Sequence, residues 1–135
     1  MKATDSFASV YPLEILIADD DTIRRGAMKQ QLTELGYSPE EAASDSEVLL
    51  MAGARRYDVI MMEALIPGID GILDFARPKL GQKPIFIALA SSYSKSISLP
   101  THVDSVITRP MDRPAFLLHL KACSVLVGKC LIKRE

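Results

Sequence analysis

The stretch Tyr57–Gly71, YDVIMMEALIPGIDG, decides how this chain folds. Its first half is an apolar run that ends at the acidic residue Glu63, which is typical of a strand buried on both faces of a parallel sheet. Its second half contains Pro67-Gly68, a dipeptide that marks a turn. The stretch therefore predicts a buried strand that places a carboxylate at its carboxyl end.

A second apolar run lies upstream and also ends in acids. Ile15–Ala18 is short, fully apolar and followed at once by Asp19, Asp20 and Asp21. The carboxyl ends of parallel strands meet at one edge of a sheet, so we expect Asp19, Asp20 and Glu63 to lie close together. Carboxylates gathered in this way would form a cation site. Asp21 is expected to be a charge at a helix N-terminus rather than a ligand.

Strands and helices alternate along the rest of the chain. The expected strands are residues 15–18, 37–43, 59–62, 84–90 and 103–107, and the expected helices are residues 23–35, a short helix from Asp45, residues 71–76 and residues 112–127. Such alternation predicts an α/β fold with a doubly wound parallel sheet covered by helices on both faces. Pro39 makes residues 37–43 a poor strand that is tolerated only at a sheet edge.

The spacing of apolar residues and the serine content predict two further features of the chain. Ile23, Ala27, Met28, Leu32 and Leu35 recur at helical spacing and are expected to form the buried face of the first long helix. Ser91–Thr101 contains five serines and Pro100, which favour an irregular segment or a missing helix between the fourth and fifth strands.

Length and composition fit one domain of ordinary composition. The chain has 135 residues, 48% of them hydrophobic, and a formal net charge of −1, which gives no reason to expect direct binding of nucleic acid. It contains no apolar run long enough for a membrane span and no signal-peptide pattern, so we expect a cytoplasmic protein. Cys123 and Cys130 are expected to be free thiols. We divide the chain into a loose leader (1–12), a domain (13–127) and a tail or linker (128–135), and it could be a module of a larger regulator.

Three motifs occur in a fixed order: Asp19-Asp20, Pro67-Gly68-Ile69-Asp70-Gly71 and Arg109-Pro110. Together they resemble the receiver domain of two-component response regulators, the CheY-like domain, over about residues 13–127. The resemblance implies a flavodoxin-like, five-stranded sheet of order 2-1-3-4-5. It also implies that an acidic pair and an acceptor aspartate hold Mg²⁺, while a lysine and a Ser/Thr hydroxyl contact the phosphoryl group.

The chain departs from that pattern at several positions. Glu63 stands where the family has its acceptor aspartate, Arg109 where it has lysine, and Leu89 where it has Ser or Thr. An aromatic residue is usual at the position of Val106. A longer carboxylate reaches into phosphoryl space, and a planar guanidinium can bind it in a bidentate manner, so a standing Glu63–Arg109 pair is expected.

Alternatives remain open for several of these residues. A register slip would place Ser91 or Ser92 at the hydroxyl position instead of Leu89. Asp19 and Asp20 could serve only strand-end solvation and helix capping. Two outcomes are open for metal binding at Asp19, Asp20 and Glu63. These acids either bind Mg²⁺ weakly or bind no metal, and binding would be lost if Arg109 neutralises them.

The departures favour a degenerate receiver, a pseudo-receiver that is not an enzyme and does not run the aspartyl phosphorylation cycle. It would bind a signalling protein, either a kinase or an output domain, in one fixed state, with homodimerisation left open. The alternative is an active phosphoacceptor that uses Mg²⁺ and acids around Glu63. A weaker third hypothesis, a nucleotide-binding pocket, has no glycine-rich loop to support it.

Overall fold

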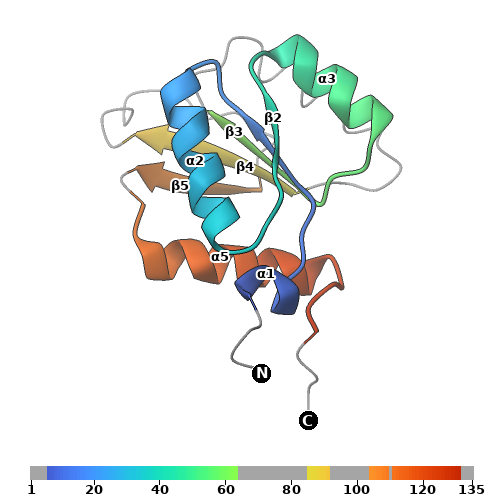
Figure 1. Cartoon of the computed structure of the whole chain (residues 1–135), viewed down its shortest axis with the longest axis vertical. Helices are drawn as coiled ribbons and strands as arrows, with labels where there is room; N and C mark the ends of the chain where they lie inside the picture. Colours follow the sequence, from blue (N-terminus) through green and yellow to red (C-terminus); the bar gives the residue numbers. More distant parts are fainter. Residues whose placement is uncertain (1–5, 64–84, 92–103, 110, 132–135) are drawn as a thin grey trace.

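The structure is a computed structural model, and it describes residues 6–63, 85–91, 104–109 and 111–131. Its strands are β1 (Ile15–Ala18), β2 (Glu40–Ala42), β3 (Val59–Glu63), β4 (Ile85–Ser91) and β5 (Ser105–Arg109), and its helices are α1 (Phe7–Val10), α2 (Thr22–Glu34), α3 (Asp45–Ala54) and α5 (Arg113–Leu126). The five strands are all parallel and follow the order β2-β1-β3-β4-β5 (Figure 1). The predicted fold class and strand order are therefore confirmed.

The sheet separates two layers of core side chains. On one face, Met28 and Leu32 of α2 and Phe116 and Leu120 of α5 pack against inward residues of the strands. On the other face, Val48 and Ala52 of α3 pack against the alternate residues of β1 and β3. β1 and β3 are buried along their whole length, because helices cover both faces of the sheet.

The helix ends follow local signals in the sequence. Asp112 caps α5 by accepting the N–H of Ala115, and a proline follows in the first turn. Gly36 and Gly128 adopt positive φ values of 98° and 77° just beyond α2 and α5, where a glycine ends a helix at no steric cost. These ends agree with the sequence prediction to within a residue or two.

The expected buried face of α2 is wrong at its N-terminal end. Ile23 is 83% exposed and Ala27 is also exposed, whereas Met28, Leu32 and Leu35 are buried as predicted. The inward-facing line of the helix therefore continues from Leu32 through Met28 to Arg24, one residue away from the position that hydrophobicity favoured. An arginine consequently points toward the sheet at the start of α2.

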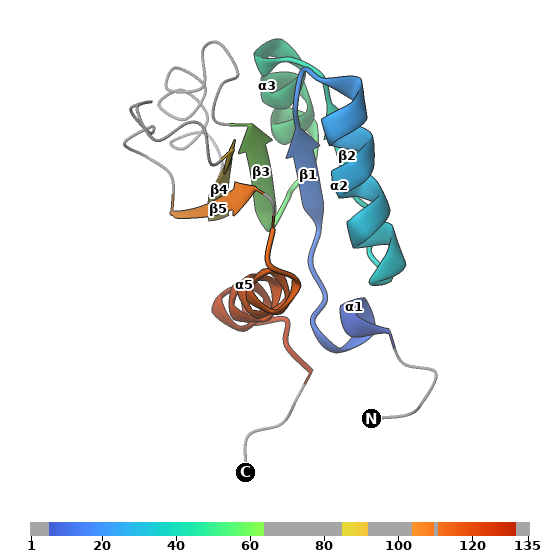
Figure 2. The same ribbon diagram turned by 90° about the vertical axis from the view of Figure 1, so that its left-hand side faces the viewer.

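The prediction of a loose leader is wrong for residues 7–10, which form α1. Ser6 caps this helix, and Phe7 and Ala8 pack against the main core. Figure 2 shows α1 at the end of the sheet opposite the arrowheads of β1 and β3. The N–H of Leu131 donates to the carbonyl of Val10 at 3.0 Å, so part of the expected C-terminal tail also folds back onto the domain.

Two predicted features fall outside the described residues. The short helix at 71–76 is one of them. The other is the irregular segment between the fourth and fifth strands, of which only Ser91, the last residue of β4, is described.

Candidate functional site

Two buried carboxylates stand side by side at the carboxyl end of the sheet. Ala18 of β1 lies opposite Met62 of β3 in register, so the next residues, Asp19 and Glu63, end their strands at the same level. Asp19 is completely buried and Glu63 is 2% exposed. Burying a carboxylate is costly unless it is paired. The expected juxtaposition of these acids is confirmed, and Glu63 is not an incidental surface residue.

Arg24 supplies positive charge to these acids. Its Nε donates to Asp19 Oδ2 at 3.1 Å and its Nη2 donates to Asp19 Oδ1 at 3.0 Å, which is the bidentate geometry that carboxylates favour. The same Nε lies 3.6 Å from Glu63 Oε2. One guanidinium therefore bridges the ends of β1 and β3.

The two remaining acids of this cluster lie at its exposed edge. Nη2 of Arg24 is 3.5 Å from Asp20 Oδ1, and its Nη1 is 3.7 Å from Asp21 Oδ2. The side chain of Asp20 is 58% exposed and that of Asp21 is 42% exposed. The hydrogen bond to Asp19 is the main reason that the pKa of Arg24 is raised above its ordinary value, with smaller contributions from the charges of Asp19, Glu63 and Asp21.

The start of α2 fixes the position of Arg24. Asp21 is the N-cap of the helix and accepts the N–H groups of Ile23 and Arg24 at 2.9 and 3.0 Å. Asp19 in turn accepts the N–H of Asp21 at 2.8 Å. Capping is thus done by Asp21 and not by Asp20, and Asp21 is a helix-terminal charge as expected.

Arg25, the next residue of α2, contacts the backbone of the same acid. Its Nη1 donates to the main-chain carbonyl of Asp19 at 2.7 Å, and its Nε lies 3.3 Å from Glu41 Oε1 in β2. It therefore fastens α2 to the two strands without touching the carboxylate of Asp19. Of the two arginines, Arg24 is the one that faces the acidic cluster.

The carboxylate oxygens of this cluster, in the arrangement that the structure shows, do not fit Mg²⁺. The ion needs oxygen ligands at about 2.1 Å in an octahedral arrangement. Both carboxylate oxygens of Asp19 are instead bonded to Arg24. Among the residues that the structure describes, no three acids, histidines or cysteines are arranged to hold a metal ion.

The register of the sheet places Leu89 directly beside Glu63. The two residues are opposite each other in the β3–β4 pair, and Leu89 is fully buried. A leucine side chain cannot donate a hydrogen bond. Val106 lies on the neighbouring strand β5 opposite Ala88 and is partly buried.

Arg109 ends β5 opposite Ser91, at the same end of the sheet as the acids. Its side chain and that of Ser91 lie outside the described residues, and so does Ser92. The Glu63–Arg109 pair therefore stays a prediction. Sequence reasoning missed Arg24, although its spacing of four residues from Met28, and of another four to Leu32, could have indicated it.

Residues 15–120 match the family described as the response regulator receiver domain. This match covers most of the chain and includes every acid of the site. The chain belongs to the response regulator receiver family. Receiver domains are modules of two-component signalling that interact with kinases and output domains, and Mg²⁺ binds weakly at their acidic site. The resemblance inferred from the three sequence motifs is thus confirmed at the level of the family.

Curated relatives place similar domains in longer proteins. The chain is 31% identical over 104 residues to the transcriptional regulatory protein AfsQ1 of Streptomyces coelicolor, which covers 75% of this chain and 46% of that protein. It is 37% identical over 70 residues to the sensor protein EvgS of Escherichia coli O157:H7, covering 52% of this chain and 6% of EvgS. The matched part of this chain therefore spans less than half the length of either relative.

Solved structures support the fold. The receiver domain of the Francisella response regulator 1452 superposes with a TM-score of 0.69 at 21% identity, covering 86% of this chain and 99% of that one. The CheY-like response regulator receiver domain from Methylobacillus flagellatus superposes with a TM-score of 0.71 at 18% identity, covering 82% of this chain and 97% of that one. Within the described residues, none of the helices combines the length and the apolar character needed to cross a membrane.

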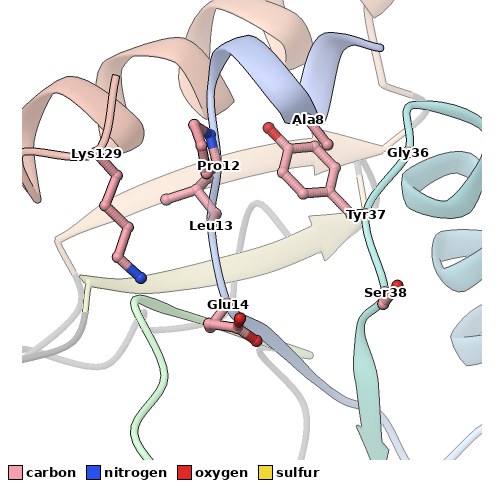
Figure 3. Close-up of a pocket in the computed structure, with 8 residues that line it drawn as sticks. All are labelled: Ala8, Pro12, Leu13, Glu14, Gly36, Tyr37, Ser38 and Lys129. Atoms are coloured by element: carbon pink, nitrogen blue, oxygen red, sulfur yellow. The ribbon is translucent and has the colours of Figure 1, made fainter. Parts of the chain in front are cut away.

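A pocket of about 220 Å³ lies at the opposite end of the sheet, between α1, the segments leading into β1 and β2, and the residues after α5 (Figure 3). Leu13, Tyr37 and Lys129 are among its lining residues. Lys129 is the only cation among the described residues of this lining, and its Nζ is bonded to Asp58 at 2.7 Å. This arrangement gives no support to binding of an anionic nucleotide.

Proposed function

We propose that this receiver domain is a pseudo-receiver: it does not accept a phosphoryl group and acts as a protein-interaction module held in one state. The observation that carries the proposal is the buried pairing of Glu63 with Leu89. The acceptor position has a longer acid, and the position of the family's hydroxyl has a side chain that cannot contact a phosphoryl oxygen.

The electrostatics of the site support the same proposal. Phosphoryl transfer depends chiefly on positioning and on stabilising charge at the transferred group. Glu63 lies within 3.6 Å of a guanidinium that is already bound to Asp19, so its carboxylate is engaged rather than poised for attack. The extra methylene of glutamate would also carry an acyl phosphate away from the place where an aspartyl phosphate forms.

The partner that we propose is a signalling protein. The relatives that match this chain include a transcriptional regulatory protein and a sensor protein, and both are longer than the matched domain. An output domain or a kinase is therefore the natural partner, in the cytoplasm, and a second copy of the domain is a further option. We do not expect the domain to contact nucleic acid directly, because the chain carries a net charge of −1.

The test is the intact mass of the chain after incubation with Mg²⁺ and acetyl phosphate. Phosphorylation would form a bond between a carboxylate oxygen and phosphorus and release acetate. We expect no phosphoryl mass on the parent chain. Glu63→Asp and the double variant Glu63→Asp/Leu89→Thr, treated in parallel, show whether restoring the family's residues restores labelling.

A labile phosphoryl adduct on the parent would overturn the proposal and support the alternative, an active phosphoacceptor with Mg²⁺ at the acids around Glu63. Glu63→Ala would then identify the acceptor, because labelling through Glu63 is lost in this variant. The interaction side of the proposal predicts that a purified kinase or output domain binds the parent equally well with and without acetyl phosphate.

A further inference from the structure

The acidic cluster of this receiver contains its own cation. Four carboxylates lie within 3.7 Å of the guanidinium of Arg24, and each of its three nitrogens faces at least one of them. Two of these acids, Asp19 and Glu63, are almost completely buried. A charge cluster of this kind requires a counter-charge, and the fold provides one from the first turn of α2.

We propose that the guanidinium of Arg24 is the resident cation of the acidic site and keeps Mg²⁺ out of it. Arginine suits this role because its planar fork binds both oxygens of one carboxylate and stays charged at all physiological pH values. Mg²⁺ would have to displace the fork from Asp19, or would have to bind beside it and be repelled by a positive charge about 4 Å away.

The geometry of α2 makes this exclusion a built-in property of the domain. Arg24 is held by the cap at Asp21 and by the packing of Met28 one turn further along the same face. The hydrogen bond from the Asp21 N–H to Asp19 Oδ1 orders the carboxylate that receives the guanidinium. The arginine is therefore positioned before any ion arrives, and little side-chain entropy is lost on pairing.

Exclusion of Mg²⁺ by Arg24 is independent of the proposed loss of phosphorylation. Arg24 could exclude Mg²⁺ whether or not Glu63 accepts a phosphoryl group. The role proposed for Arg24 is only to neutralise Asp19, Asp20 and Glu63. The consequence is that the charge of this end of the molecule does not depend on the Mg²⁺ concentration, so a partner always meets the same surface.

The experiment is a titration of the full chain with Mg²⁺. Binding is measured by isothermal titration calorimetry and by the amide NMR shifts of residues 19–24 and Glu63. We expect no saturable binding to the parent at millimolar Mg²⁺. Arg24→Gln, which removes the charge but keeps polar bulk, should gain saturable binding at least about tenfold tighter than any seen in the parent, equivalent to about 1.4 kcal/mol.

Three matched variants locate the effect. Arg25→Gln removes a neighbouring charge that contacts Asp19 through its main-chain carbonyl and pairs with Glu41, and it should gain no Mg²⁺ binding. Arg24→Lys keeps the positive charge, and its Mg²⁺ binding should remain as weak as that of the parent. Asp20→Asn added to Arg24→Gln should abolish the gained binding, because Asp20 is the exposed ligand available to an entering ion.

The proposal is overturned if the parent itself shows saturable Mg²⁺ binding at millimolar concentration with shifts at Asp19 and Glu63, or if a folded Arg24→Gln gains no binding. The titration of the parent needs no variant, so this result is available even if Arg24→Gln does not fold. A parent that takes no Mg²⁺ yet gains phosphoryl mass would refute the proposed function and leave the role of Arg24 intact. A parent that binds Mg²⁺ but is never phosphorylated would do the reverse.

Discussion

The two ends of the sheet both pair a buried or half-buried carboxylate with a cation, but in different ways. At the amino end, Asp58 Oδ2 accepts the backbone N–H of Glu14 and the Nζ of Lys129, both at 2.7 Å. At the carboxyl end, Asp19 and Glu63 share the guanidinium of Arg24 with two further acids. One acid with two donors is sufficient to fasten the chain, whereas at the carboxyl end four acids of the described part of the chain gather around the guanidinium of Arg24, which is more than packing requires.

This difference indicates which end carries the chemistry of the family. The Asp58 cluster fastens β1, β3 and the residues after α5 together, because its backbone also bonds Glu14 and Ile85. The Asp19 cluster instead gathers like charges at the sheet edge where receivers hold their cation. In this chain the negative charge has been kept and an internal arginine serves as its counter-ion.

The largest effect is expected from removing that arginine. Arg24→Gln should lower the free energy of unfolding by about 2–3 kcal/mol, less than the full cost of breaking a buried pair because the arginine side chain is 40% exposed. Lys129→Gln, at the other end, should cost only about 0.5–1 kcal/mol. Urea denaturation of both variants measures the contrast, and equal losses would mean that the two clusters are equivalent.

Added Mg²⁺ should affect the stability of Arg24→Gln and of Lys129→Gln differently. A ligand that binds only the folded state raises stability by mass action. Added Mg²⁺ should therefore recover part of the stability lost in Arg24→Gln and should leave the parent and Lys129→Gln unchanged. Thermal melts with and without Mg²⁺, with Ca²⁺-free buffers, give this comparison directly, and an equal rise in all three proteins would indicate only non-specific ion effects.

A pair of glycine substitutions compares the two ends through the backbone. Gly36→Ala at the amino end should cost about 1–2 kcal/mol, because φ is +98° there and a Cβ would lie 2.5 Å from Ser6 Oγ. Gly26→Ala in α2 meets no atom within 4 Å and should stabilise the protein by about 0.5–1 kcal/mol through helix propensity. Denaturation midpoints that move in the same direction would contradict this reading.

Tyr37→Phe tests the attachment of the N-terminal segment. The hydroxyl of Tyr37 donates to the carbonyl of Tyr11 at 2.6 Å, and its ring contacts Phe7 of α1. Losing one neutral hydrogen bond should cost about 1 kcal/mol. Hydrogen exchange should show faster opening of residues 7–11, with the amides near Asp19 unaffected; faster exchange at both ends would mean that the ends are coupled.

The smallest effect at neutral pH concerns the thiols. Burial raises the pKa of the Cys123 thiol to about 11 from an ordinary value of 9.0. The neutral thiol is favoured by folding, so its contribution to stability is complete below pH 9.0 and is lost as the pH rises toward 11. Cys123 should therefore react slowly with iodoacetamide at pH 8 while the half-buried Cys130 reacts readily, and equal rates would contradict this.

Much of the fold could be predicted because its signals are local. Apolar runs such as Ile15–Ala18 and Val59–Met62 mark strands buried on both faces, and Gly36 and Asp112 mark helix ends through the conformation and hydrogen bonds of single residues. The placement of Asp19 beside Glu63 followed from the parallel arrangement alone. The strand order came from the resemblance to receivers and agrees with the structure.

The failures have a common cause, which is dependence on tertiary contacts. Arg24 lies on the inward line of α2 because the sheet edge there is acidic, whereas hydrophobicity alone favoured Ile23. The four residues of α1 are too few to be stable alone and depend on contacts with Tyr37 and Leu35. Neither feature is visible in the composition of its own segment.

The most direct test of the account is one amide NMR comparison of the parent chain, before and after Mg²⁺ and acetyl phosphate are added together. An internally neutralised pseudo-receiver should show no saturable shifts at residues 19–24, Glu63 or Leu89. Saturable shifts at these amides would contradict the account, because they would show that the acidic site still binds an ion or a phosphoryl group despite Arg24 and Glu63.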